Sequence, residues 1–138
     1  MDLKRFEQVQ KLCIKEVKAE IRSGYKETHW IWFIFPQLKG LGSSMVSNYY
    51  GLNNLEEARE YYDNKYLRKN LLSCFRLVLK LEDERDLSNC FGMLDSVKIR
   101  SCATLFYIAT KKNIFKKFLD KFFEGLLDNK TMLLLQER

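Results

Sequence analysis

Apolar residues recur three or four positions apart along most of this chain, which is the spacing of one face of an α-helix. The first such stretch runs from Asp2 to about Ser23, with lysines and glutamates on its other face, and its apolar positions are Phe6, Val9, Cys13, Val17 and Ile21. Gly24 follows, and glycine is the usual residue just past a helix end. The pattern therefore predicts a first amphipathic helix that ends at Gly24.

The same spacing predicts further helices over residues 55–62, 65–81, 94–109 and 113–123. Asn53 or Asn54 is placed to cap the first of these. Shorter turns are expected at 44–49, at 87–92 ending on Gly92, and from Asn129 or Thr131 onward. No credible sheet is predicted. We therefore expect an all-α fold: one compact multi-helix domain over residues 1–138, packed around a central aromatic segment.

That segment is the block of residues 29–37, which holds both tryptophans, the only histidine and the only proline. So much aromatic bulk belongs at the centre of a core. The run is too short for its periodicity to separate helix from strand, and a buried helix is favoured because no second strand-like run lies nearby. Thr28 is placed as the N-cap of this helix.

Composition limits the class of protein. A chain of 138 residues, 46% hydrophobic and 30% charged, describes an ordinary globular domain. The four cysteines form no CxxC pair and no secretory signal is recognised, so free, buried thiols in a reducing cytoplasm are expected. With one histidine, neither a metal site nor a cofactor is predicted. The aromatic block falls short of the roughly 20 apolar residues that span a bilayer.

A net charge of +6 favours anionic partners such as phosphates, and nucleic acid is the less favoured of these. The basic face of residues 113–123 resembles a nucleic-acid-binding helix, but it equally resembles a solvated surface helix. The loop that follows the aromatic block, residues 40–44 (GLGSS), combines glycines with hydroxyls and can form an anion-binding nest. A plain turn with a helix N-cap explains the same residues.

Two further groups are candidates for chemistry. His29 can act as a general acid or base, or it can simply bond a backbone carbonyl at a helix start. On a helix, Asp95 and Lys98 share one strip with Ser101 at its edge. A lysine in so apolar a helix is costly unless paired, so Asp95 either neutralises it or orients it to hold a substrate anion.

These motifs resemble the DUF1810 family of unknown function. The resemblance rests on residues 3–6 with Gln10, on 24–30, on 32–37 with 40–43, on Asp95, Lys98 and Ser101 with 104–106, and on the C-terminal part from 113 to Asp128. It implies an all-α single domain and assigns no activity. The chain departs from the family pattern at Asn64, Lys65, Arg68 and Asn70, which bears on substrate or activity only where those positions touch a ligand.

The leading hypothesis is a cleft between the aromatic segment with its loop and the Asp95/Lys98 helix, which binds or processes a phosphate-bearing, nucleotide-like small molecule of the NAD or ADP-ribose kind. The residues assigned to it are His29 and Asp95 as catalytic groups and Lys26, Trp30, Gln37, Gly40, Gly42, Ser43, Lys98 and Ser101 as ligand-binding groups. Whether the protein is an enzyme stays open; a hydrolase or glycosidase is the favoured class. The alternative is a non-catalytic module that binds protein or nucleic acid through the basic C-terminal helix.

Overall fold

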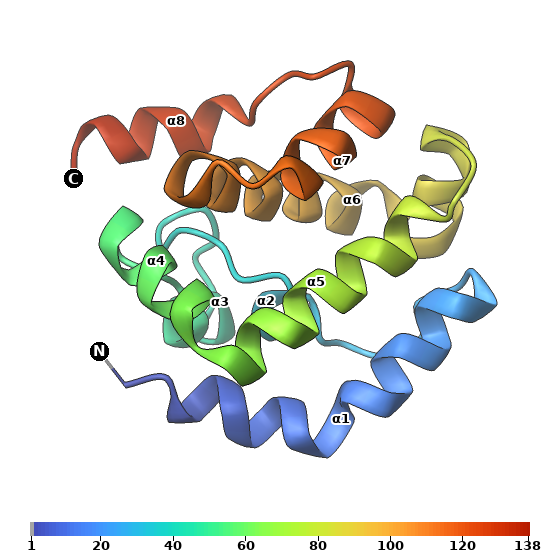
Figure 1. Cartoon of the computed structure of the whole chain (residues 1–138), viewed down its shortest axis with the longest axis horizontal. Coiled ribbons are helices and arrows are strands. Elements are labelled where there is room, and N and C mark those ends of the chain that lie inside the picture. The colour runs from blue at the N-terminus through green and yellow to red at the C-terminus, as the bar shows by residue number, and fades with distance from the viewer. Residues whose placement is uncertain (1) are drawn as a thin grey trace.

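The computed structural model describes residues 2–138, and this part of the chain forms eight helices and no strand (Figure 1). The helices are α1 (Lys4–Ser23), α2 (Ile31–Ile34), α3 (Met45–Tyr50), α4 (Leu55–Asp63), α5 (Lys65–Leu79), α6 (Glu84–Thr110), α7 (Asn113–Phe123) and α8 (Asn129–Gln136). One isolated parallel bridge joins Leu38 to Leu52. The predicted all-α class is confirmed.

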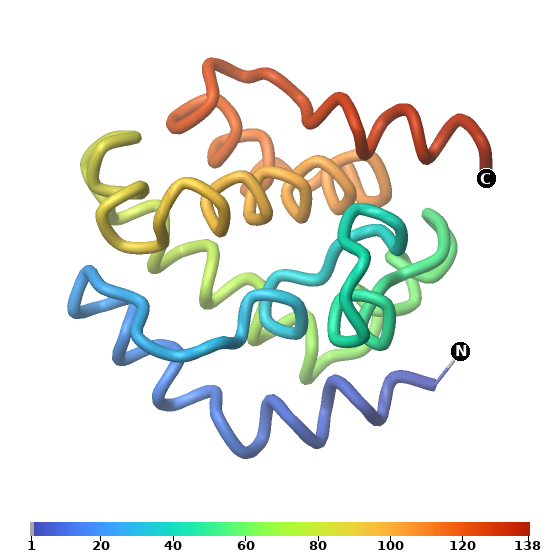
Figure 2. Tube along the Cα trace, turned by 180° about the vertical axis from the view of Figure 1, so that it is seen from behind, coloured from blue at the N-terminus to red at the C-terminus, as the bar shows by residue number. Residues whose placement is uncertain are grey.

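Helix α5 crosses the middle of the molecule, with α1 packed on one side and α7 on the other (Figure 1). Helix α6 packs against α4, α7 and α8. Seen from behind, the two short helices α2 and α3 lie in the space between α1 and α6 (Figure 2). The aromatic segment and the loop after it therefore face α6, as the leading hypothesis requires.

Several helix ends follow the capping chemistry expected from the sequence. Gly24 closes α1 with φ 81°, a left-handed conformation that costs glycine little. The Asn54 side chain accepts a hydrogen bond from the Glu57 backbone N–H at the start of α4. Asn64 does the same for Leu67 at the start of α5. Asn64, one of the departures from the family pattern, thus has a structural role as a helix cap.

The aromatic block is helical over a single turn, so the expectation of a buried helix is only partly correct. Residues 29 and 30 lie outside any helix, α2 covers Ile31–Ile34, and Phe35 has φ −117° and ψ 75°. The residue before a proline is disfavoured in the helical region, which explains why Pro36 ends the turn so soon. Thr28 is not the N-cap: that position belongs to Trp30, whose side chain makes no capping bond.

The block does occupy the core. Trp30 and Phe35 are buried, and Phe35 packs edge-on against Phe75 of α5 with ring centres 5.1 Å apart. Trp30 meets the ring of Phe91 on α6 in the same T-shaped way at 6.0 Å. Trp32, by contrast, is only half-buried. The block thus packs against α5 and α6 and leaves the Trp32 indole partly exposed.

Helix α6 contains a sharp break at Gly92, where φ is 78° and ψ is 163°. The turn predicted to end at Gly92 and the helix predicted after it are both present, joined across this kink. Leu94 and Val97 belong to the apolar spacing that predicts the second of these helices, yet Leu94 is 80% exposed and Val97 is exposed as well. Periodicity locates an apolar strip but does not say whether a neighbouring element covers it.

Three buried polar side chains connect α1, α4 and α5. The Gln10 amide donates to the Phe33 carbonyl at 2.7 Å and to the Tyr61 hydroxyl at 2.9 Å, and it accepts from the Asn70 amide at 2.9 Å. Each group gains a partner, which buried amides require. Asn70, another departure from the family pattern, therefore lies in the core.

Candidate functional site

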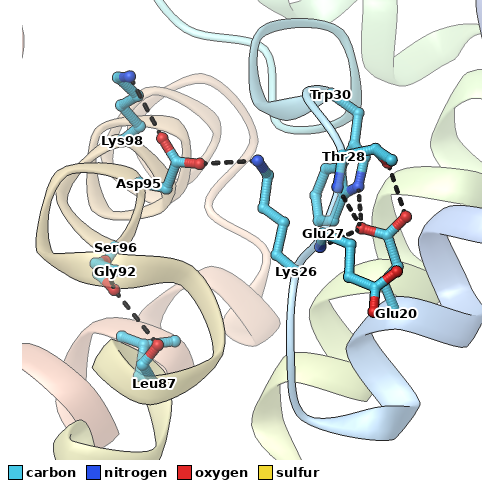
Figure 3. A network of polar contacts seen from close by, with 10 residues as sticks. All are labelled: Glu20, Lys26, Glu27, Thr28, Trp30, Leu87, Gly92, Asp95, Ser96 and Lys98. Atoms are coloured by element: carbon cyan, nitrogen blue, oxygen red, sulfur yellow. Dashed lines mark hydrogen bonds and ion pairs between the residues drawn. The ribbon is translucent and has the colours of Figure 1, made fainter.

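Two lysines meet one carboxylate between the linker after α1 and the second half of α6. The Lys26 ammonium lies 3.0 Å from one oxygen of Asp95, and the Lys98 ammonium lies 3.2 Å from the other (Figure 3). Asp95 and Lys98 stand one helical turn apart on α6, as predicted, whereas Lys26 comes from the opposite wall. Both oxygens of Asp95 are occupied, so its position fixes both ammonium groups.

The linker that carries Lys26 is shaped by Glu20, near the end of α1. One Glu20 oxygen accepts hydrogen bonds from the backbone N–H groups of residues 27 and 28 and from the Trp30 indole, and the other accepts from the Thr28 hydroxyl (Figure 3). Burial acts to raise the pKa of Glu20, but these hydrogen bonds outweigh it and lower the pKa to about 2. Lys26 is further held by its own N–H, which donates to the Cys90 carbonyl at 2.8 Å.

A first compartment of about 520 Å³ opens beside this pair, and we call it the aromatic compartment. Its walls include Lys26, His29, Trp30, Trp32, Tyr50, Asp95 and Lys98. His29 is exposed and lies in the irregular linker, immediately before Trp30, the N-cap of α2. The structure thus brings His29 and Lys98, which are far apart in the sequence, to one cavity.

The two tryptophans of this compartment differ in availability. Trp30 is only 2% exposed and its indole N–H is bonded to Glu20, while the Lys26 ammonium lies 5.1 Å from its ring centre. Trp32 is half-buried, and the Lys98 ammonium lies 5.0 Å from its ring centre. Both are cation–π distances. Trp32 therefore offers the more accessible ring for a ligand, although the sequence argument had selected Trp30.

A second compartment of about 490 Å³ lies on the other side of Trp32, and we call it the polar compartment. Its walls include the polar residues Gln37, Ser43, Ser101, Asp128 and Lys130, together with Gly42 and the apolar residues Leu41, Leu94 and Val97. Trp32, Ser44 and Lys98 line both compartments. The two cavities are therefore neighbours that meet along these three residues, and together they hold nine of the ten residues assigned from the sequence.

The tenth is Gly40, which lines neither compartment. It lies beneath α8: a Cβ placed on Gly40 would come within 3.0 Å of the Arg138 guanidinium. The Arg138 side chain also donates to the Lys39 carbonyl at 2.6 Å. In the same loop, Ser44 caps α3 by accepting from the Ser47 N–H. Part of the loop thus serves as the simple turn and N-cap that the sequence also allowed.

Gly42 is required where it is for a different reason. A Cβ on Gly42 would fall 2.7 Å from the outer edge of the Trp32 indole and 2.8 Å from the Ser47 hydroxyl. The glycine therefore lets the loop pass directly against the indole that separates the two compartments. Sequence reasoning missed Trp32, Ser44, Asp128 and Lys130 as lining residues. The aromatic block and the GLGSS loop gave a signal for the first two, but nothing local distinguished the other two.

The remaining reactive groups lie outside the cleft. Cys74, Cys90 and Cys102 are buried free thiols, and burial is the main cause that raises their pKa, to about 12 for Cys74, about 11 for Cys90 and well above the ordinary value for Cys102. Such thiols are poor nucleophiles. Within residues 2–138 no group of three or more acidic, histidine or cysteine side chains is placed to bind a metal ion.

The basic face of α7 is engaged in surface contacts. Lys116 pairs with Asp120 at 2.8 Å, and Lys121 donates to the Leu79 carbonyl at 2.7 Å. Lys117 is exposed.

Across the part of the chain that the structure describes, no helix combines the length and apolarity needed to cross a membrane.

The chain is similar to a family model and to a solved structure. A family model described as "Protein of unknown function (DUF1810)" matches residues 1–135. No curated protein matches the chain. The chain is also similar to a solved structure, the crystal structure of the conserved hypothetical protein Rv1873 from Mycobacterium tuberculosis at 1.38 Å. The two sequences are 41% identical, and the structures align with a TM-score of 0.93 over 98% of this chain and 96% of that one.

Proposed function

The chain belongs to the DUF1810 family of proteins of unknown function, and from the cleft that its motifs form we propose that it binds a phosphate-bearing, nucleotide-like small molecule of the NAD or ADP-ribose kind. The observation that carries this proposal is the convergence of Lys26, Asp95 and Lys98 on one cavity with Trp32 and His29. Cavities of several hundred Å³ with apolar walls and a few convergent polar groups are the usual form of a small-molecule site.

Charge favours an anion at Lys98. Two ammonium groups face a single carboxylate, which leaves one positive charge uncompensated in the trio. The Lys26 side chain is 8% exposed and faces Asp95, whereas the Lys98 side chain is 31% exposed. Lys98 is therefore the group with room to accept a phosphate while Asp95 keeps it in place.

Aromatic rings favour a planar group beside that anion. Trp32, Phe33 and Tyr50 line the same compartment, and the rings of Phe33 and Tyr50 lie 5.1 Å apart. Rings of this kind supply large contact area and stacking faces at a low entropic cost. A nucleotide whose base packs against Trp32 would place its phosphate near the Lys98 ammonium.

The proposed chemistry is hydrolysis of the bound ligand, with His29 as the acid–base group. Hydrolysis adds a hydroxyl to one fragment and a proton to the other, and His29 accepts the proton from water or gives it to the leaving group. His29 is the only imidazole in the sequence and it lines the aromatic compartment. Asp95 acts by positioning Lys98.

A thermal-shift panel tests the binding proposal. AMP, ADP, NAD and ADP-ribose are each added to the protein, and binding at 100 times Kd should add about 2.7 kcal/mol to the free energy of unfolding. Lys98→Met should abolish the shift, and Lys117→Met, an exposed lysine on α7, is the matched control that should keep it. If all four compounds leave the melting temperature unchanged, the proposed function is wrong.

A further inference from the structure

We propose that the ligand of this cleft has two organic arms joined through phosphate: a planar base in the aromatic compartment, phosphate beside Lys98, and a hydroxyl-bearing, sugar-like arm in the polar compartment. This inference rests on the proposed function: it assigns each part of a sugar-linked nucleoside diphosphate to its own place in the cleft. The substrate class then follows from how the two cavities are joined.

The junction between the cavities is the first argument. Trp32, Ser44 and Lys98 line both cavities, so a ligand that reaches Lys98 from one side has the other cavity directly beyond it. Lys98 is the one ammonium group that lines both. A phosphate at this point would be central in the ligand, with a substituent on each side, because space continues in both directions.

The two cavities differ in the chemistry of their walls. The aromatic compartment presents the rings of Trp32, Phe33 and Tyr50. The polar compartment presents the Gln37 amide, the Ser43 hydroxyl and the Lys130 ammonium, beside apolar side chains from Leu41, Leu94 and Val97. Rings fit a flat heterocycle, whereas amide, hydroxyl and ammonium groups fit a moiety that offers several hydroxyls. One ligand with unlike arms satisfies both sets of walls.

Size supports the same conclusion. The cavities measure about 520 and 490 Å³, and each lies within the range of about 300–1,000 Å³ found for single small-molecule sites. A mononucleotide that fills the aromatic compartment and reaches Lys98 leaves the polar compartment in contact with water alone. A second arm would exchange that water for hydrogen bonds to the protein.

Two variants separate the arms. Ser43 is exposed, and its hydroxyl makes no hydrogen bond within residues 2–138, so Ser43→Leu fills the polar compartment without removing an internal contact. Gly42→Ala places a methyl group 2.7 Å from the Trp32 indole and displaces the ring that both arms share. Gln8→Leu, at an exposed position in the first half of α1, is the control for an added surface leucine.

Calorimetric titration of the full chain with AMP and with ADP-ribose provides the test. We expect ADP-ribose to bind about tenfold more tightly than AMP, because its second arm adds hydrogen bonds to the polar compartment. Ser43→Leu should reduce ADP-ribose affinity to the AMP level and leave AMP unchanged, Gly42→Ala should weaken both, and Gln8→Leu should change neither.

The outcomes distinguish this inference from the function it rests on. Equal affinity for AMP and ADP-ribose, or an equal loss of both in Ser43→Leu, would show that the polar compartment takes no second arm, while nucleotide binding itself would stand. Failure of both compounds to bind would overturn the proposed function and this inference with it. Melting temperatures of all variants, measured without ligand, verify that each one is folded.

Discussion

The Lys26 ammonium lies 3.0 Å from the Asp95 carboxylate, and this ion pair joins the linker after α1 to α6 across the candidate cleft. The pair is well shielded, with the Lys26 side chain 8% exposed and the Asp95 side chain 17% exposed. Removing one partner from such a pair leaves the other charge short of its compensation. The pair therefore has consequences for stability that are separate from any ligand.

We expect Asp95→Ala to lower the free energy of unfolding by about 1.5–3 kcal/mol, because it leaves the shielded Lys26 ammonium without its carboxylate. Lys26→Met should cost less, since Asp95 keeps Lys98 as a partner. Urea denaturation of the two variants measures the difference. Equal losses of unfolding free energy in the two variants would show that water solvates the Lys26 ammonium well enough without Asp95.

Glu20 should make stability depend on pH in the acid range. Its pKa is about 2 in the folded protein against an ordinary value of 4.5, so its contribution is fully present above about pH 4.5 and is lost as the pH falls toward 2. Glu20→Gln removes that ionisation. Chemical denaturation at several pH values should show the wild type losing stability over this window more steeply than the variant, and parallel curves would contradict the assignment.

The kink at Gly92 should tolerate substitution less well than the helix end at Gly24. Gly92 has φ 78° and ψ 163°, a region essentially reserved for glycine, and alanine there should cost about 1–3 kcal/mol. Gly24 has φ 81° and ψ 15°, an ordinary left-handed conformation, and Gly24→Ala should cost about 1 kcal/mol. Neither added Cβ would meet an atom within 4 Å, so the comparison isolates the backbone.

The amide pair Gln10 and Asn70 should prove energetically coupled. Asn70→Leu leaves the buried Gln10 oxygen without its donor and should cost about 1–3 kcal/mol. Gln10→Leu removes bonds to two further groups and should cost more. In a double-mutant cycle the combined variant should lose less than the sum of the two, and strict additivity would show that the bond contributes nothing.

The His29→Gln variant tests the proposed hydrolysis separately from ligand binding. Because the His29 side chain is exposed on the linker, His29→Gln should leave the free energy of unfolding within about 0.5 kcal/mol of the wild type. Incubation with ADP-ribose or NAD, followed by chromatographic separation of products, should show hydrolysis in the wild type and a loss of about 10²-fold or more in the variant. Equal turnover in both proteins would remove His29 from the mechanism.

The elements that could be predicted from the sequence are those whose fate is decided locally. Asn54, Asn64 and Gly24 end or begin helices through bonds to residues within a turn, so their type alone indicates the boundary. Asp95 and Lys98, one turn apart on a helix, were predicted as neighbours for the same reason.

What could not be predicted depends on contacts between distant segments. Nothing near Lys26 indicates that it reaches Asp95, and nothing near Leu94 indicates that no element covers it. The aromatic block was expected to be a longer helix. Its apolar pattern alone does not include the restriction that Pro36 places on the backbone of Phe35. The choice of Trp30 over Trp32 failed to anticipate that Glu20 would engage the first indole.

The Glu20 carboxylate gathers four donors from the linker, yet no residue of α1 lines either compartment. Fraying of the end of α1 would release these four hydrogen bonds to the wall that carries Lys26 and His29, so we expect the two segments to exchange as one cooperative unit. A bound ligand should slow amide hydrogen exchange in the last turns of α1, a helix that it never touches.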